Sequence, residues 1–134
     1  MATMTYKGSC HCGRVRFEAD LDLSAPTFRC NCTYCTKARN WFITTQPDGF
    51  RLLAGESDLA DYQFGQKRIH HQFCRHCGVR PFGRLAAEGM APFVAVALGS
   101  LDDVDPAQLA AAPINYFDGR NDNFQSAPAE TRHL

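Results

Sequence analysis

The spacing of seven cysteines constrains this chain of 134 residues more than any other feature of its sequence. They fall into two tight pairs, far apart in the chain, and one group of three between them. The pairs are Cys10 with Cys12 and Cys74 with Cys77, and the group of three is Cys30, Cys32 and Cys35. In a reducing compartment, cysteines at such short spacings favour metal or redox chemistry over a disulfide framework.

The two pairs together predict a structural zinc site. Each pair is followed by a glycine, Gly13 or Gly78, which can supply the positive φ of a tight turn whose N–H groups point at bound sulfurs. Two pairs provide four thiolates for a closed tetrahedral site. Zinc binding contributes about 10–16 kcal/mol in small zinc domains, against a domain stability of about 5–15 kcal/mol, so such a site can hold the fold together. The alternatives are two redox pairs or buried hydrophobic cysteines.

The remaining three cysteines predict a metal site of a different kind. Three thiolates can hold zinc and leave its fourth position to water or substrate, as in catalytic zinc sites. A fourth ligand from His or Asp would instead make a second closed site. A third interpretation needs no metal, because clustered thiolates near Lys37 and Arg39 would be reactive enough for a redox sensor.

The histidines are not expected to complete the group of three. His71 lies in a β-type run on the same face as Ile69 and Phe73, which indicates a core or sheet position. His11 and His76 each stand between paired cysteines and are expected to point away from the metal that those cysteines bind. The group of three therefore keeps an open position in this interpretation.

Short strands separated by turn signals dominate the sequence. Val15, Phe17 and Ala19 alternate with charged residues in 13–20, and this period of two is typical of a half-buried strand. Further strands are expected at 41–45, 50–55, 60–65, 68–74, 79–85 and 91–99. The last of these runs is apolar on both faces, as a central strand would be.

Helix signals are few. Residues 33–39 can form one or two turns, and a helix over 105–112 is favoured by an N-cap aspartate, Asp105, with Pro106 at the first helical position. The polar, turn-rich residues 118–134 predict a surface arm. The expected fold is therefore mainly β, with short antiparallel strands and one or two short helices.

Composition narrows the functional classes. The length and the hydrophobic content of 45% fit one globular domain, 1–134, that can bury a core. Fourteen basic residues balance fourteen acidic ones, which argues against a dedicated nucleic-acid binder. The longest apolar run is too short to span a bilayer, and the N-terminal residues lack a signal pattern. We therefore expect a cytoplasmic protein without a membrane or nucleic-acid partner.

Three cysteine blocks resemble a known family. "GSCHCGRVRFE" at 8–18, "CNCTYCTKA" at 30–38 and "FCRHCGVRPF" at 73–82 closely resemble the glutathione-dependent formaldehyde-activating enzyme family, which also includes centromere protein V. "DGRNDNF" at 118–124 looks like the C-terminal arm of that family. The order and spacing of all seven cysteines match, so the resemblance covers nearly the whole chain.

The resemblance implies a β-tent fold with two zinc ions per chain. It implies that Cys10, Cys12, Cys74 and Cys77 hold structural zinc, and that Cys30, Cys32 and Cys35 hold catalytic zinc. The chemistry that it implies is condensation of glutathione with formaldehyde to S-hydroxymethylglutathione, formally a carbon–sulfur lyase reaction in reverse. Glutathione would then be a co-substrate, and a small aldehyde its partner.

Glutathione carries two carboxylates, so a binding site for it needs basic side chains. The candidates near the group of three are Lys37, Arg39 and Arg29, with Trp41 and Phe42 as apolar flanks. Asp118, Arg120 and Asn123 are candidates for closing over the site from the arm. The alternatives are solvated surface charges, core aromatic residues and a polar turn.

Two functional hypotheses follow from these residues. In the first, the protein is a zinc-dependent enzyme that forms or cleaves the thiol adduct of a small aldehyde. In the second, it is a non-catalytic zinc module that binds a protein or nucleic acid, although the zero net charge weighs against nucleic acid. The sequence does not define the oligomeric state.

Overall fold

A computed structural model describes residues 3–134, which form two β-sheets and two short α-helices. The strands are β1 (Met4–Ser9), β2 (Arg16–Leu21), β3 (Thr27–Cys30), β4 (Trp41–Thr45), β5 (Phe50–Ala54), β6 (Leu59–Tyr62), β7 (Ile69–Cys74), β8 (Phe82–Leu85), β9 (Phe93–Ala97) and β10 (Ile114–Phe117). The helices are α1 (Thr33–Ala38) and α2 (Pro106–Ala111). The expectation of a mainly β fold with short helices is confirmed.

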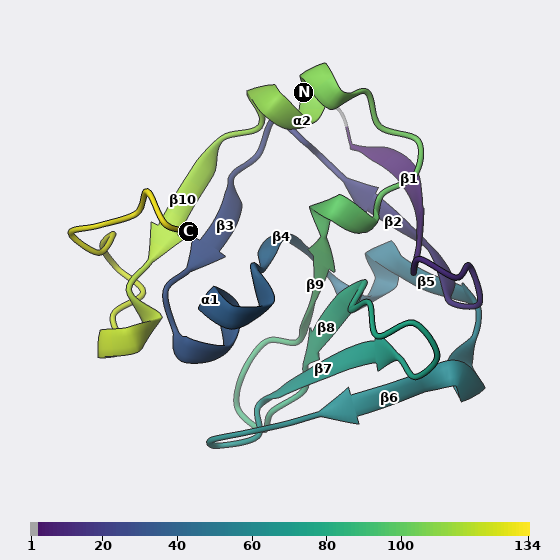
Figure 1. The fold of residues 1–134 in the computed structure, drawn as a ribbon, viewed down its shortest axis with the longest axis horizontal. Coiled ribbons are helices and arrows are strands. Elements are labelled where there is room, and N and C mark those ends of the chain that lie inside the picture. Colours follow the sequence, from purple (N-terminus) through teal and green to yellow (C-terminus); the bar gives the residue numbers. More distant parts are fainter. Residues whose placement is uncertain (1–2) are drawn as a thin grey trace.

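The strands are shared between a small sheet and a large one. The small sheet has the order β1-β2-β5, and the large sheet has the order β10-β3-β4-β9-β8-β7-β6. Strands β3 and β10 on one side and β1 and β2 on the other diverge from α2 like the two sides of a tent (Figure 1). The pairing is antiparallel within both sheets except between β10 and β3, which run parallel.

Most of the predicted elements are present. Strand β4 coincides with the predicted run 41–45, and β9 lies in the middle of the large sheet, as its apolar sequence indicates. Asp105 caps α2, because its carboxylate accepts a hydrogen bond from the N–H of Ala107. Strands β1, β3 and β10 were not predicted. Two of them, β3 and β10, pair with each other although more than eighty residues separate them in the sequence. A local sequence pattern cannot predict such a distant pairing.

An aromatic core joins the two sheets. Phe17 of β2 and Phe50 of β5 belong to the small sheet, and their ring centroids are 5.3 Å apart. Phe82 of β8 belongs to the large sheet and lies 6.0 Å from Phe17 and 4.7 Å from Phe50. Val15 and Ala19 are fully buried beside Phe17, which confirms the predicted alternation in this segment. Burial of these apolar side chains is the main force that packs the sheets together.

The C-terminal residues 118–134 form a largely exposed arm that begins with a 3₁₀ turn over Gly119–Asn121. The arm turns back on itself, since the backbone of Asp118 pairs with that of Asn123. Neither α1 nor α2, the helices of the described chain, has the length and apolar character that a bilayer crossing requires.

Candidate metal centres and clefts

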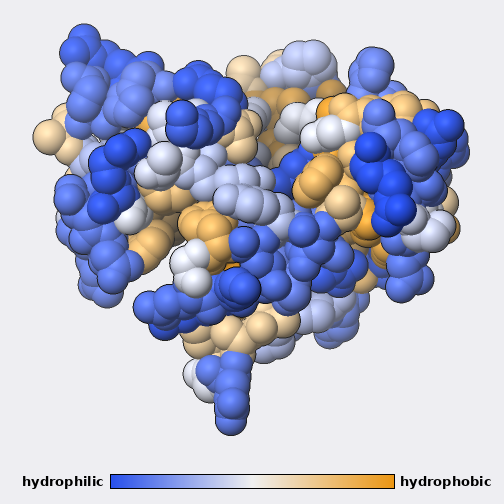
Figure 2. Space-filling view, turned by 60° about the horizontal axis from the view of Figure 1, so that its bottom comes forward, coloured by the Kyte–Doolittle hydropathy of each residue, from blue (hydrophilic) through white to orange (hydrophobic). Residues whose placement is uncertain are grey.

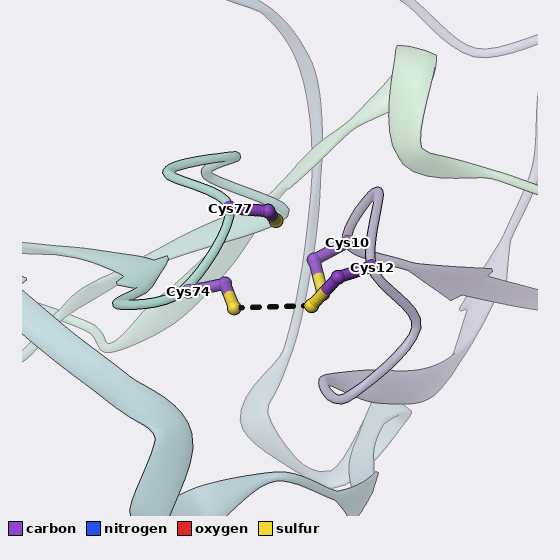
Figure 3. A group of neighbouring side chains, drawn as sticks. All are labelled: Cys10, Cys12, Cys74 and Cys77. Atoms are coloured by element: carbon purple, nitrogen blue, oxygen red, sulfur yellow. Dashed lines mark hydrogen bonds between the residues drawn. The ribbon is translucent and has the colours of Figure 1, made fainter.

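The two cysteine pairs meet where the two sheets adjoin. Cys10 directly follows β1 and Cys12 lies in the turn before β2, whereas Cys74 ends β7 and Cys77 lies in the turn before β8. The two turns face each other with their sulfur atoms turned inward (Figure 3). We call Cys10, Cys12, Cys74 and Cys77 the four-cysteine cluster. It links the small sheet to the large sheet.

The sulfur geometry of the four-cysteine cluster suits a tetrahedral metal. The four Sγ atoms lie within 4.8 Å of one another, and Cys12 Sγ is 3.6 Å from both Cys10 Sγ and Cys74 Sγ. A zinc ion with Zn–S bonds of about 2.3 Å holds its sulfur ligands about 3.8 Å apart. The residues present therefore fit zinc, with small adjustments.

Hydrogen bonds at the turns around the four-cysteine cluster lower the pKa of Cys12 and Cys77, whereas burial raises the pKa of Cys74. Gly13 and Gly78 have φ angles of 82° and 79°. These are the positive values predicted for the glycine that follows each cysteine pair. Backbone N–H groups of Val79 and Cys12 lower the pKa of Cys77 to about 6. Because only the deprotonated sulfur binds zinc, the shift at Cys77 favours the form that could bind a metal.

No histidine belongs to either cysteine cluster in residues 3–134. His76 hydrogen-bonds through Nε2 to Oδ1 of Asp58 at 2.8 Å, and His11 is exposed. These positions agree with the expectation that both side chains stay out of the metal site.

The remaining cysteines gather at the N-terminus of α1. Cys30 ends β3, Cys32 is the N-cap of α1, and Cys35 lies in the first helical turn. Their Sγ atoms lie within 4.8 Å of one another, and no fourth Cys, His, Asp or Glu among residues 3–134 joins them. We call them the three-cysteine cluster. Their donor set fits zinc with one coordination position left to another ligand.

Hydrogen bonds hold the three sulfurs in place. The N–H of Cys32 donates to Cys30 Sγ at 3.4 Å, and the N–H of Cys35 donates to Cys32 Sγ at 3.3 Å. Asn40 donates from Nδ2 to Cys35 Sγ at 3.5 Å. The neighbouring thiols of Cys30 and Cys35 lower the pKa of Cys32, while the neighbouring sulfurs and burial raise the pKa of Cys35. These contacts favour the thiolate form at Cys32.

The C-terminal arm lies against the three-cysteine cluster. Asn31, between two of the cysteines, donates from Nδ2 to Oδ1 of Asp118 at 2.8 Å and accepts at Oδ1 from the N–H of Arg120 at 2.9 Å. At Gly119, a β-carbon would lie only 2.5 Å from Cys30 Sγ. Asp118 and Arg120 thus lie near the cluster, as expected of a closing arm. Asn123 donates from Nδ2 to Ser126 Oγ at 2.8 Å, within the arm itself.

Two clefts flank α1. The arginine cleft, of about 690 Å³, includes Arg29, Arg39, Arg80 and Trp41 in its lining. The cysteine cleft, of about 640 Å³, includes Cys32, Lys37, Tyr62, Phe64 and Arg120 in its lining. The clefts adjoin, because Tyr34, Ala38 and Tyr62 line both.

The ligand candidates from the sequence are divided between these clefts. Lys37 lines the cysteine cleft beside Cys32, whereas Arg39 and Trp41 line the arginine cleft on the other side of α1. Phe42 lines neither, because its ring packs 5.6 Å from that of Phe28 within the large sheet.

Both clefts are lined by basic side chains although the chain has no net charge. No aspartate or glutamate of the described chain lines either of them. In the arginine cleft, the guanidinium of Arg29 lies 5.0 Å from the ring of Trp41, and that of Arg80 lies 5.9 Å from the ring of Tyr34. Within residues 3–134, neither arginine has an acidic side chain within ion-pair distance. Cations without acidic partners attract anionic ligands.

An aromatic group beside Cys32 was missed by sequence reasoning. Tyr34, Tyr62 and Phe64 stack on one another, and His71 packs behind them with its ring centroid 4.1 Å from that of Tyr34. His71 is buried, as predicted, and burial and the charge of Arg80 lower its pKa to about 4. The sequence does contain one signal, since two predicted strands joined by a short connection place Tyr62 opposite His71.

Comparisons with known proteins agree with this arrangement. The model of a family described as glutathione-dependent formaldehyde-activating enzyme matches residues 5–117. A crystal structure of a Rhodobacter sphaeroides protein, solved as a structural genomics target, is 31% identical in sequence. The match has a TM-score of 0.69 and covers 81% of this chain and 99% of that one. The matched family region contains both cysteine clusters.

Proposed function

The chain belongs to the glutathione-dependent formaldehyde-activating enzyme family, and on that premise we propose that it forms or cleaves the adduct of a thiol with a small aldehyde. In the forward direction the thiol sulfur bonds to the carbonyl carbon, and the thiol proton ends on the carbonyl oxygen. The reverse direction breaks the same carbon–sulfur bond, which makes the protein a carbon–sulfur lyase. The proposed thiol is glutathione or a close relative.

Two zinc ions are part of this proposal. The four-cysteine cluster would hold the structural ion, and the three-cysteine cluster would hold the catalytic ion. A zinc ion with three thiolate ligands supplies a fourth position at which a thiol loses its proton near neutral pH. Unpaired thiols at this density suit a reducing compartment, so a cytoplasmic location belongs to the proposal.

The chain's own side chains would bind and orient the substrates. Lys37 and Arg120 in the cysteine cleft, and Arg29 in the arginine cleft, carry the positive charge that the carboxylates of glutathione need. The cleft walls would hold thiol and aldehyde together, which removes much of the entropic barrier to their addition. The arm, anchored on Asn31, covers the cluster on the side of Cys30, so substrates would approach beside Cys32.

One observation carries the proposal more than any other. The three-cysteine cluster has sulfurs at metal-binding distance, has no fourth side-chain ligand in residues 3–134, and adjoins a cationic cleft through Cys32. A purely structural zinc site has four protein ligands, and it has no need of an adjoining cleft.

Exchange spectroscopy by NMR tests the proposal directly. Glutathione and formaldehyde form their adduct without a catalyst, so the measured quantity is the rate of exchange between free and bound formaldehyde at equilibrium. The zinc-loaded protein is expected to raise this rate without changing the equilibrium constant. Leu53→Ala, a change on an exposed side chain of β5, serves as the control. An unchanged exchange rate with fully loaded protein would favour the non-catalytic zinc module instead.

A further inference from the structure

The cysteine cleft has an aromatic wall made of Tyr34, Tyr62 and Phe64. Their ring centroids lie between 5.5 and 5.8 Å apart, and their planes differ by 25° to 29°. These distances are typical of aromatic pairs, which prefer offset stacking with centroids about 4.5–7 Å apart, so the three rings form one contiguous apolar group. All three residues line the same cleft as Cys32.

A buried residue packs against the aromatic wall, and two of the wall's rings remain partly exposed to solvent. The buried ring of His71 lies 4.1 Å from Tyr34 and stacks on Phe64 at 5.4 Å with an angle of 11°. Tyr62 and Phe64 nevertheless remain 48% and 44% exposed. Hydrophobic residues that gather beside a functional site and stay exposed are typical of ligand-binding surfaces.

Figure 2 shows how hydrophilic and hydrophobic residues are distributed over one face of the molecule. Hydrophilic residues cover most of that face, and hydrophobic residues lie in hollows between them. In the cysteine cleft the cations, Lys37 and Arg120, accompany the aromatic wall, and no acidic residue of the described chain lines the cleft. The cleft therefore combines basic side chains, which attract anions, with an aromatic wall.

Formaldehyde has a single carbon and no group that can stack on a ring. The aldehyde part of its adduct therefore makes no use of the aromatic wall. An aldehyde with an aromatic substituent would use the wall, because its ring follows the carbonyl carbon directly and so extends from the thiol sulfur along the cleft.

We propose that the cysteine cleft accepts thiol adducts of aromatic aldehydes, with the aldehyde's ring stacked on Tyr62 and Phe64. The inference rests on the proposed function, and it names the substrate class of that same site. The reaction is balanced as before: the thiol sulfur bonds to the carbonyl carbon, and the thiol proton ends on the carbonyl oxygen.

Binding of two stable analogues to the zinc-loaded full chain tests the inference. S-benzylglutathione carries the ring and the carbon–sulfur bond of the benzaldehyde adduct, and S-methylglutathione carries only the bond. Isothermal titration calorimetry is expected to give a dissociation constant at least about tenfold lower for the benzyl analogue, since stacking and apolar burial together exceed the free energy of one tenfold step.

Variants of the aromatic wall assign the effect to its residues. Tyr62→Ala and Phe64→Ala are expected to reduce the benzyl-to-methyl preference severalfold, while Tyr62→Phe keeps the ring and preserves it. Both side chains are about half exposed, so their truncation leaves the core intact. Leu53→Ala removes similarly exposed apolar area from a residue that does not line the cleft, and it is expected to leave the preference unchanged.

The outcomes separate the inference from its premise. Equal affinity for the two analogues would overturn the inference and leave the proposed function standing. A benzyl preference that survives the Tyr62→Ala/Phe64→Ala double variant would also overturn it, because the ring would then bind elsewhere. Binding of neither analogue would overturn the inference alone, because S-alkylated analogues have no thiol to lose a proton. The formaldehyde-exchange measurement with glutathione decides separately whether the proposed function stands.

Discussion

The two cysteine clusters differ in which parts of the fold supply their sulfur atoms. The four-cysteine cluster draws its sulfurs from turns of two different sheets, and two of its members, Cys10 and Cys74, are part of the hydrophobic core. The three-cysteine cluster takes all its sulfurs from one strand end and the helix that follows it. A metal in the first cluster joins distant parts of the chain, whereas a metal in the second joins residues that local hydrogen bonds already hold. The first is therefore suited to stability and the second to exchangeable ligands.

The largest expected effect is the loss of a ligand from the four-cysteine cluster. Cys74→Ser removes a fully buried sulfur at the contact between the sheets. We expect the variant to lose one zinc ion and most of its folding free energy, which is about 5–15 kcal/mol in ordinary domains. Urea unfolding followed by circular dichroism, with zinc counted by native mass spectrometry, measures both. A stable, fully folded Cys74→Ser protein would contradict the assignment of this cluster as the structural site.

The matching change in the three-cysteine cluster is expected to spare the fold. Cys32 caps α1 by accepting the N–H of Cys35, and serine is a good N-cap, so Cys32→Ser keeps this hydrogen bond. We expect a stability change below about 1 kcal/mol. The same variant is expected to lose the other zinc ion and its effect on formaldehyde exchange. If Cys32→Ser lost as much folding free energy as Cys74→Ser, the two clusters would not differ in their contribution to stability.

The close contact between the arm and the three-cysteine cluster predicts an intermediate effect. In Gly119→Ala, the new methyl group would lie 2.5 Å from Cys30 Sγ, so either the arm or the sulfur has to move. We expect a loss of about 1–3 kcal/mol and faster release of one zinc ion to a chelator. Gly99→Ala is the matched control for stability and zinc release, because a methyl group there meets no atom within 4 Å. Equal zinc release by the two variants would show that the contact has no effect on the metal.

The last expected effect is a dependence of stability on pH near the aromatic wall, confined to pH values below about 6.5. Burial and Arg80 lower the pKa of His71 from 6.5 to about 4 in the folded protein. Below pH 6.5 the unfolded chain binds a proton that folded His71 does not, so the free energy of unfolding falls as the pH drops from about 6.5 to about 4. NMR titration of the imidazole measures this pKa directly, and Arg80→Met is expected to raise it. A midpoint at 6.5 in the wild type would disprove the burial effect.

Local sequence patterns predicted the two cysteine clusters better than the residues that surround them. Cysteine spacing and the following glycines predicted which sulfurs come together, because short turns fix the relative positions of residues two or three apart. The same reasoning found β4 and the cap of α2. The catalytic and ligand-binding roles assigned to these residues remain predictions.

The environment of the three-cysteine cluster depends on contacts between distant segments. Asn31 meets the arm only because β10 pairs in parallel with β3, and the stack of Tyr34 on Tyr62 depends on where the large sheet places its edge strand. Arg80 faces the arginine cleft for the same reason. Pairing of this kind is set by the packing of the whole sheet, which a single sequence pattern does not specify.

Strand β10 lies far after its partner β3 in the chain, so the two sides of the three-cysteine cluster are synthesised at different times. The ribosome releases the N-terminal part of a chain first, and Asn31 precedes Asp118, its partner in the arm, by 87 residues. The sulfurs of the three-cysteine cluster therefore emerge long before the segment that covers them. A metal ion delivered to the nascent chain can reach this cluster from the side that the completed protein closes.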